Sequence, residues 1–291
     1  MQLRRLAALA MVGALALTAC GKEGDTGTSG VKVDAAKDVA VAGSPTFDKI
    51  KARGKVIIGV KEDQPNLGFK DPTTNKFSGF DIEMANLIAA KLGFAADKIE
   101  YKAIPSANRE TAISGDQIDY YVGTYSITDK RKNQISFAGP YFIAGQDLLV
   151  RKDDTSITGP DALSGKTVCS ATGSTSIQRI KEKYPQAKTV EFQKYSQCVE
   201  QLIGKQVDAV TTDDAILKGY AAQQADKIKV LGKPFSEEKY GIGLPKDDKA
   251  LRDKVNDIIE ASIKDGTWKK IYDGTLGKSG SPAEPPQVNR Y

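Results

Sequence analysis

Hydrophobic and polar residues in the middle of the chain alternate between two spacings. A continuous apolar run at 56–60 is typical of a short strand that is buried on both faces. From residue 81 the apolar residues recur with the period of a helix, which we expect Asp81 to cap and Gly93 to end. A strand followed by such a helix predicts a βαβ unit.

The same alternation continues toward the carboxyl terminus. It predicts helices at 108–114, 174–184 and 196–203, and strands at 118–122, 166–170, 189–192 and 207–211. The chain between residues 47 and 277, roughly 230 residues, is long enough for two lobes of ordinary domain size. The predicted fold class is therefore α/β, with two α/β lobes.

A short internal similarity relates the two lobes. Residues 113–119 and 202–208 each contain the end of a predicted helix, a glycine, and a strand that begins with an aliphatic residue and Asp. Chance similarity between two such turns is the alternative. Thr124 and Asp213 each follow that Asp at the same distance, beyond the carboxyl end of a predicted strand. Ligands bind at these ends in open α/β sheets, so we expect a cleft between the lobes that closes by hinge bending.

Residues 1–20 have the pattern of a secretory signal. Two arginines precede an uncharged run at 6–17, and small residues then lead to Cys20. The run is about twelve residues long, whereas a spanning helix needs about 20. We therefore expect residues 1–19 to be removed and Cys20 to carry two or three acyl chains, which anchor a protein durably. An ordinary signal peptide with an incidental Cys20 is the alternative.

The segments that flank the predicted lobes have different compositions. Residues 20–46 are rich in small and polar residues and contain no aromatic residue, which predicts a flexible tether. Residues 278–291 contain several prolines, which predicts a loose tail.

Composition excludes several classes of function. The chain contains no histidine, which excludes His-based catalysis and imidazole metal sites, and we expect no catalytic residue, metal or cofactor. The net charge of +5 arises from interspersed acidic and basic residues, so nucleic acid is not an expected partner. With Cys20 lipidated, Cys169 and Cys198 are expected to pair in an oxidising compartment. Two buried free thiols are the alternative.

Three polar clusters follow predicted strands. The first, at 124–131, contains hydroxyls and Arg131, which suit a carboxylate; the alternative is that Thr128 caps a helix and Arg131 is solvated. The second, at 173–176, lies where a helix begins and suits an anion, although Ser174 could be a simple cap. The third, at 211–214, offers Asp213 to an ammonium group or as a helix cap. Opposite charges from two lobes fit a zwitterion.

Over residues 47–277 the chain resembles the family 3 extracellular solute-binding proteins of polar amino-acid ABC importers. The resemblance is carried by residues 78–82, 125–131, 135–141, 171–175, 207–210, 240–244 and 265–268. It implies a periplasmic-binding-protein-like fold with two hinge strands, near 142–149 and 240–244, and a ligand cleft between the lobes. Lobe 1 would comprise residues 47–144 and 241–277, and lobe 2 residues 145–240.

The resemblance also implies roles for individual residues. Thr124, Ser126, Arg131, Ser174 and Thr175 would hold the α-carboxylate of an amino-acid ligand. Asp213 would hold its amine. The expected partners are the ligand, the transmembrane subunits of an ABC permease, and the membrane through the lipid anchor on its extracytoplasmic face. We expect a monomer.

Two further segments bear on which amino acid is bound. Residues 106–109 are similar to the segment that sends an arginine, here Arg109, to the side-chain carboxylate in glutamate and aspartate binders, and Lys61 matches a second basic position there. A ligand with two carboxylates needs a second cationic pocket, which Lys61, Ser106 and Arg109 would form. The alternatives are a solvated Lys61 and an Arg109 that pairs with Glu110 or Asp116.

Glutamate is the expected ligand ahead of aspartate. Residues 105–109 and 210–217 look like those of actinobacterial glutamate-uptake lipoproteins. Glutamine or another polar amino acid is the nearest rival, and a dehydratase-like enzyme or a sensor on the same fold is more remote. Gln64 and its neighbours stand where the family commonly places an aromatic residue, so the contact to the aliphatic part of the ligand stays open between Phe69 and Tyr101.

Overall fold

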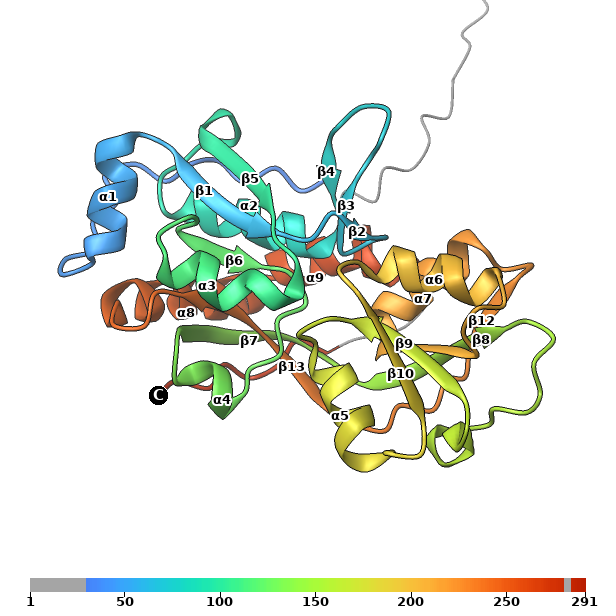
Figure 1. Cartoon of the computed structure of the whole chain (residues 1–291). Helices are drawn as coiled ribbons and strands as arrows, with labels where there is room; N and C mark the ends of the chain where they lie inside the picture. Colours follow the sequence, from blue (N-terminus) through green and yellow to red (C-terminus); the bar gives the residue numbers. More distant parts are fainter. Residues whose placement is uncertain (1–29, 280–283) are drawn as a thin grey trace, which may run out of the picture.

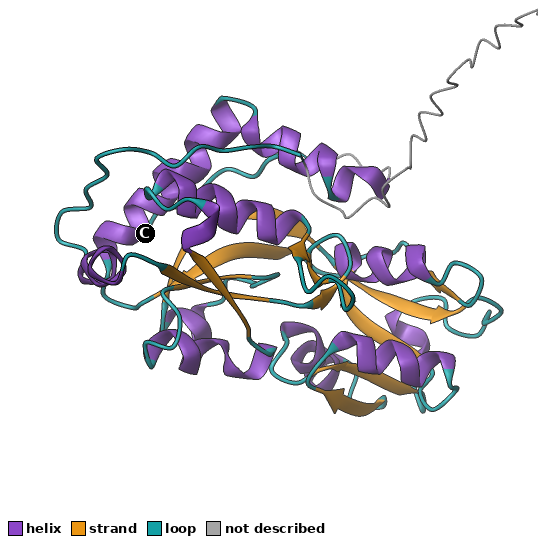
Figure 2. Ribbon diagram, turned by 90° about the horizontal axis from the view of Figure 1, so that it is seen from above, coloured by secondary structure: helices purple, strands orange, loops and turns teal. Residues whose placement is uncertain are grey.

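The computed structural model describes residues 30–279 and 284–291, which form two α/β lobes side by side (Figure 1). Helices cover the sheets from both sides (Figure 2). Within these residues no helix is long and apolar enough to cross a membrane. The predicted signal peptide and the lipidation of Cys20 lie outside the described residues.

Lobe 1 is built on a five-stranded sheet in the order β5-β1-β6-β13-β7. The first three strands are parallel, and β13 runs antiparallel to its neighbours. The strands are β1 (Val56–Val60), β5 (Ile99–Ala103), β6 (Tyr120–Val122), β7 (Ser136–Ala144) and β13 (Glu238–Leu244). A small second sheet contains β2 (Asp63–Gln64), β3 (Gly68–Lys70) and β4 (Phe77–Ser78). The helices are α1 (Pro45–Arg53), α2 (Phe80–Lys91), α3 (Arg109–Ser114), α4 (Asp129–Lys132), α8 (Lys249–Lys264) and α9 (Thr267–Gly274).

Lobe 2 is built on a second five-stranded sheet, in the order β10-β9-β11-β8-β12. Its strands are β8 (Gln146–Arg151), β9 (Thr167–Ala171), β10 (Lys188–Phe192), β11 (Ala209–Asp213) and β12 (Ile228–Val230). Its helices are α5 (Thr175–Lys183), α6 (Tyr195–Ile203) and α7 (Asp214–Gln223). A disulfide joins Cys169 on β9 to Cys198 on α6, with 5.5 Å between their Cα atoms, which confirms the predicted pair.

The chain passes between the lobes twice. It leaves lobe 1 at Gly145, between β7 and β8, and returns through the segment that enters β13. The cross-lobe strands predicted near 142–149 and 240–244 therefore coincide with β7–β8 and β13. Two crossings of this kind permit hinge bending between the lobes.

The internal similarity has a structural counterpart. Both strands that it contains begin later than predicted, at Tyr120 and Ala209, because the aspartates before them bind a neighbouring strand. Asp119 accepts a hydrogen bond from Ile57 N at 2.7 Å, and Asp208 accepts one from Thr167 N at 2.8 Å. The two segments thus have the same role in their lobes.

Asp81 does not cap α2 as predicted. The helix begins at Phe80, after Gly79, and the side chain of Asp81 is fully buried. Its carboxylate accepts hydrogen bonds from Thr124 N at 3.0 Å and from the Tyr141 hydroxyl at 2.7 Å. Burial raises the pKa of Asp81 to about 6. Asp81 therefore fixes the backbone at Thr124 rather than the end of its own helix.

The described part of the predicted tether packs on lobe 1. Val41 is buried and other valines at 31–39 pack against the core, while Ala36 N donates to Ala90 O at 2.8 Å. Ser44 donates to the Asp248 carboxylate at 2.7 Å, just before α1 begins. The prediction of a tether over 20–46 is therefore corrected for residues 30–44, because the valines supply apolar surface that lobe 1 buries.

The end of the predicted loose tail is also in contact with lobe 1. Asn289 N donates to Gly139 O at 2.9 Å, and Phe137 N donates to the Tyr291 hydroxyl at 2.8 Å. Both partners lie on β7, an edge strand with no further strand of the sheet beside it. The prediction of a loose tail is therefore wrong for its last residues.

Candidate functional site

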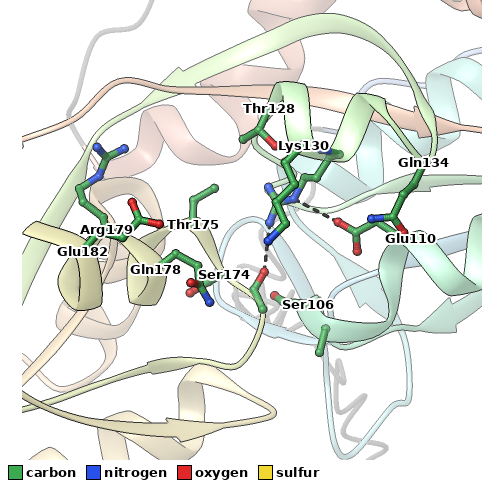
Figure 3. A pocket seen from close by; sticks show the side chains of 13 residues that line it. Ser106, Glu110, Thr128, Lys130, Gln134, Ser174, Thr175, Gln178, Arg179 and Glu182 are labelled. Atoms are coloured by element: carbon green, nitrogen blue, oxygen red, sulfur yellow. Dashed lines mark hydrogen bonds and ion pairs between the residues drawn. The ribbon is translucent and has the colours of Figure 1, made fainter.

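Residues after the carboxyl ends of the strands of lobe 1 meet residues after β9 in lobe 2. The Arg131 guanidinium donates to Gly173 O at 3.1 Å, and the hydroxyls of Ser126 and Thr175 lie 3.4 Å apart. A cavity of about 410 Å³ opens beside these contacts, with Arg131, Ser174 and Thr175 in its lining (Figure 3). The two predicted edges of the cleft therefore face each other.

Arg131 is a buried side chain rather than a solvated one. Thr128 does cap α4, since its hydroxyl accepts from Arg131 N at 3.2 Å. The guanidinium nevertheless turns inward, donating to Ser126 O at 2.7 Å and to the Glu110 carboxylate at 3.2 Å. Burial, together with the charge of Arg109, lowers the pKa of Arg131. Thr128 therefore caps the helix, as the alternative stated, but the guanidinium of Arg131 is buried rather than solvated.

Tyr125 holds both arginines of the site, and sequence reasoning did not single it out. The guanidinium carbons of Arg109 and Arg131 lie 4.1 Å and 4.8 Å from the centre of its ring. The ring itself is fixed edge-on against Tyr121 and Phe137. Stacking of this kind favours a cation and restricts its orientation. The only local signal was an aromatic residue between the hydroxyls at 124 and 126.

Lys61, Ser106 and Arg109 are brought together as predicted. Lys61 is 4% exposed and its ammonium donates to the Ser106 hydroxyl at 2.7 Å, so the solvated alternative is wrong. Arg109 is 2% exposed, and its Nε donates to Ser106 O at 3.1 Å. The Nη1 of Arg109 is 3.4 Å from Thr124 O, which links these three residues to the residue that follows the end of β6.

The acidic residues that the alternative pairs with Arg109 are engaged elsewhere. Glu110 pairs with Arg131 at 3.2 Å, and Asp116 pairs with Lys49 at 2.8 Å on the surface. Burial, then the charge of Arg109, lowers the pKa of Lys61 to about 7. Lobe 1 thus holds a cluster of buried basic side chains beyond the carboxyl ends of its parallel strands.

Thr124 is held by residues from three other elements, α2, β2 and α3. Its backbone has a φ of 46°, in the left-handed region, and its amide is held by Asp81. Its hydroxyl lies 3.1 Å from the Gln64 side-chain nitrogen on β2. Gln64 is fully buried, a role that its sequence position did not reveal. Gln64 therefore orients the Thr124 hydroxyl without help from a ligand.

Asp213 is the buried acid of lobe 2. It precedes α7 but makes no capping hydrogen bond, so the helix-cap alternative is wrong. Its Oδ2 accepts from the Tyr240 hydroxyl at 2.6 Å, while its Oδ1 has no hydrogen-bond partner in the described part of the chain. Tyr240 also forms a backbone bridge with Ser126. Burial, then the negative charge of Glu238, raises the pKa of Asp213 to about 7.

Ser174 and Thr175 occupy the start of α5. Ser174 caps this helix by accepting from Ile177 N at 3.1 Å, as its alternative reading stated. Thr175 donates to the Glu238 carboxylate at 3.1 Å. Glu238 is buried at the hinge and also pairs with Arg179 at 2.9 Å. Sequence reasoning missed Glu238, since nothing around it in the chain indicates its burial.

No group of three or more metal-ligating side chains occurs among residues 30–279 and 284–291. The site instead combines hydroxyls, guanidinium groups and one ammonium from lobe 1 with an acid and a helix start from lobe 2. Such a set can hold a small zwitterion by charge-assisted hydrogen bonds.

Residues 56–278 match the family model for bacterial extracellular solute-binding proteins, family 3. The chain belongs to this family. The solute-binding protein is 39% identical over 271 residues to the glutamate-binding protein GluB of Corynebacterium glutamicum, covering 90% of this chain and 91% of that one. It is 41% identical over 245 residues to a glutamine-binding protein of Geobacillus stearothermophilus, covering 84% and 92%.

A solved structure gives the same fold. An ancestral arginine-binding protein bound to arginine matches with a TM-score of 0.73 and 38% identity, covering 77% of this chain and 99% of that one. Membership of an extracellular family means that the solute-binding protein acts outside the cytoplasm. Its relatives are solute-binding proteins rather than enzymes, which favours binding without catalysis.

Proposed function

We propose that this protein captures glutamate, with aspartate as a weaker ligand, and delivers it to the permease of an ABC importer. Arg131, with the hydroxyls of Thr124, Ser126, Ser174 and Thr175, holds the α-carboxylate. Asp213 holds the ammonium group. Lys61, Ser106 and Arg109 hold the side-chain carboxylate. A lipid on Cys20 keeps the protein at the outer face of the membrane.

The observation that carries this proposal is the burial of Lys61 beside Arg109. A buried cation is costly unless an anion pairs with it, and the lowered pKa of Lys61 reflects that cost. A ligand with one carboxylate engages Arg131 and leaves Lys61 unpaired. A second carboxylate supplies the missing charge, whereas the neutral amide of glutamine does not.

Asp213 supports the zwitterionic part of the proposal. It is 4% exposed, and the free lone pairs of its Oδ1 can accept from an ammonium group. Burial, then the negative charge of the neighbouring acid Glu238, raises its pKa. A bound ammonium offsets this repulsion, so the carboxylate is stabilised when the ligand is present.

Calorimetric titration of the protein, freed of ligand by unfolding and refolding, tests the proposal. We expect glutamate to bind with micromolar affinity or better, aspartate more weakly, and glutamine and arginine more weakly still. The relatives that bind glutamine make glutamine the critical comparison. Clear heat with glutamine and none with glutamate or aspartate would contradict the acidic ligand while keeping the family.

The protonation of Asp213 and that of Lys61 should affect the affinity in opposite ways as the pH changes. Below about pH 7 Asp213 takes up a proton in the free protein, so binding of any amino acid weakens by up to about tenfold per pH unit. Above about pH 7 Lys61 loses its proton, so binding of glutamate weakens again by a similar factor. Glutamine does not need a charged Lys61 and should show only the acidic limb.

Titrations with both ligands from about pH 5 to about pH 8.5 would measure these limbs. The groups facing Asp213 are Glu238, Tyr240, Asp214 and Arg131, and those facing Lys61 are Arg109, Arg131, Asp63, Asp81 and Ser106. A glutamate affinity that stays flat above pH 7 would contradict the role of Lys61.

A further inference from the structure

A second set of contacts joins the lobes beside the ligand-binding residues. The turn that connects β2 to β3 in lobe 1 lies against α6 and α7 of lobe 2 (Figure 1). The Asp63 carboxylate accepts from Ser196 N at 3.2 Å and from the Tyr220 hydroxyl at 3.1 Å. The same hydroxyl also contacts Asp63 O. None of these groups belongs to the proposed ligand contacts.

Gly219 permits the closest approach between the lobes. It lies inside α7, where glycine lowers helix stability relative to alanine. A Cβ atom at this position would lie 2.5 Å from Pro65 O, which is closer than real Cβ atoms approach. Pro65 belongs to lobe 1 and Gly219 to lobe 2. A side chain at position 219 would therefore clash with Pro65 only when the lobes are together.

We infer that the 63–65 turn and the α7 segment Gly219–Tyr220 form a closure latch that sets the affinity of the site for every ligand alike. Gly219 makes room for the turn, and Tyr220 hydrogen-bonds to it. The ligand is held by both lobes, so it binds tightly only to the closed arrangement. Any change in the population of that arrangement multiplies all apparent affinities by the same factor. Gly219 and Tyr220 therefore set affinity without taking part in selectivity.

The rim of the latch carries an ion pair that matters less. Lys194 and Glu62 lie 2.6 Å apart across the lobes, but their side chains are 46% and 28% exposed. Exposed pairs are screened and contribute little. Gly219 and the ring of Tyr220 are buried, and the hydrogen bonds of the Tyr220 hydroxyl are partly buried, so these contacts carry the inference.

Gly219→Ala separates closure from folding. Alanine is the better helix former, so we expect the ligand-free protein to unfold at the same or a higher urea concentration. We expect the affinity for each amino acid to fall at least tenfold, by one common factor, with faster dissociation. Small-angle scattering should give a larger radius of gyration for Gly219→Ala than for the wild type with the same amino acid present. Gly159→Ala is the matched control, because Gly159 is extended and has open space around its Cβ position.

Tyr220→Phe is the second variant, since it removes the hydroxyl and keeps the ring. We expect an affinity loss of about tenfold, again equal for all ligands, because a partly buried hydrogen bond to a charged group is lost. Tyr184→Phe, on a lobe 2 tyrosine that packs against Phe235, is its matched control. Unchanged affinity in both latch variants, or losses that differ between amino acids, would overturn the inference.

The inference rests on the proposed function only because the affinity must be measured with an amino acid that the protein binds. If the wild type binds glutamine instead of glutamate, the acidic ligand is wrong and the latch variants are measured with glutamine. The radius of gyration reports closure whichever solute is bound. An affinity loss accompanied by a lower unfolding midpoint in Gly219→Ala would point to damaged folding and would also overturn the latch.

Discussion

Replacing Arg131 by alanine is expected to lower the affinity for every amino acid about a thousandfold, or about 4 kcal/mol. The guanidinium is 7% exposed and is aimed by Tyr125, Ser126 O and Glu110. An α-carboxylate in the closed cleft would lose its charged partner and stay buried without one. Since all amino acids share that carboxylate, calorimetry should find the loss with glutamate and glutamine alike.

Two further variants sharpen this test. Arg131→Lys keeps the charge but loses the planar fork, so we expect an intermediate loss of about a hundredfold. Arg290→Ala removes an arginine that pairs with Asp257 and Glu260 on the surface, and it should leave the affinity unchanged. A loss confined to one amino acid in Arg131→Ala would show that Arg131 binds a side chain rather than the common carboxylate.

Lys61→Met is expected to change the selectivity of the site. The affinity for glutamate should fall about a hundredfold or more, because truncating one partner of a buried charged pair costs about 2 to 5 kcal/mol. The affinity for glutamine should change less than about threefold, since its amide needs no cation. Competition calorimetry with the two ligands would give the ratio directly.

The same substitution should stabilise the ligand-free protein. Methionine has a similar length and no charge, so the cost of burying the ammonium disappears, and we expect a rise of about 1 kcal/mol in the free energy of unfolding. Lys55→Met is the control at the other end of β1. Its ion pair with Glu100 is partly exposed and should contribute little. Equal loss of glutamate and glutamine in Lys61→Met would contradict the proposed pairing.

Much of the local structure could be predicted from the sequence. The bounds of β1 were predicted correctly, because a strand buried on both faces needs a continuous apolar run. Thr128 and Ser174 cap their helices through hydrogen bonds that span only three residues. The pairing of Cys169 with Cys198 followed from the number of cysteines left after Cys20.

Asp81 shows where local reasoning failed, and Asp213 shows where it left two roles open. Each precedes or begins a helix, which is where a capping aspartate is expected. Their partners come instead from distant parts of the chain: Thr124 and Tyr141 for Asp81, and Tyr240 for Asp213. No local pattern distinguishes a capping aspartate from a buried one, because the difference lies in which strands are neighbours.

The sequence by itself determined the α/β alternation, the helix caps at Thr128 and Ser174, the disulfide partners and the exclusion of imidazole chemistry, since each depends on residue type or on contacts within a few residues. Only the tertiary structure decided that Lys61 and Arg131 are buried, that Tyr125 aims two guanidinium groups, and that Gly219 meets Pro65. These features depend on sheet order and on the closeness of two lobes. Residues far apart in the chain become neighbours there, and burial then sets their charge and orientation.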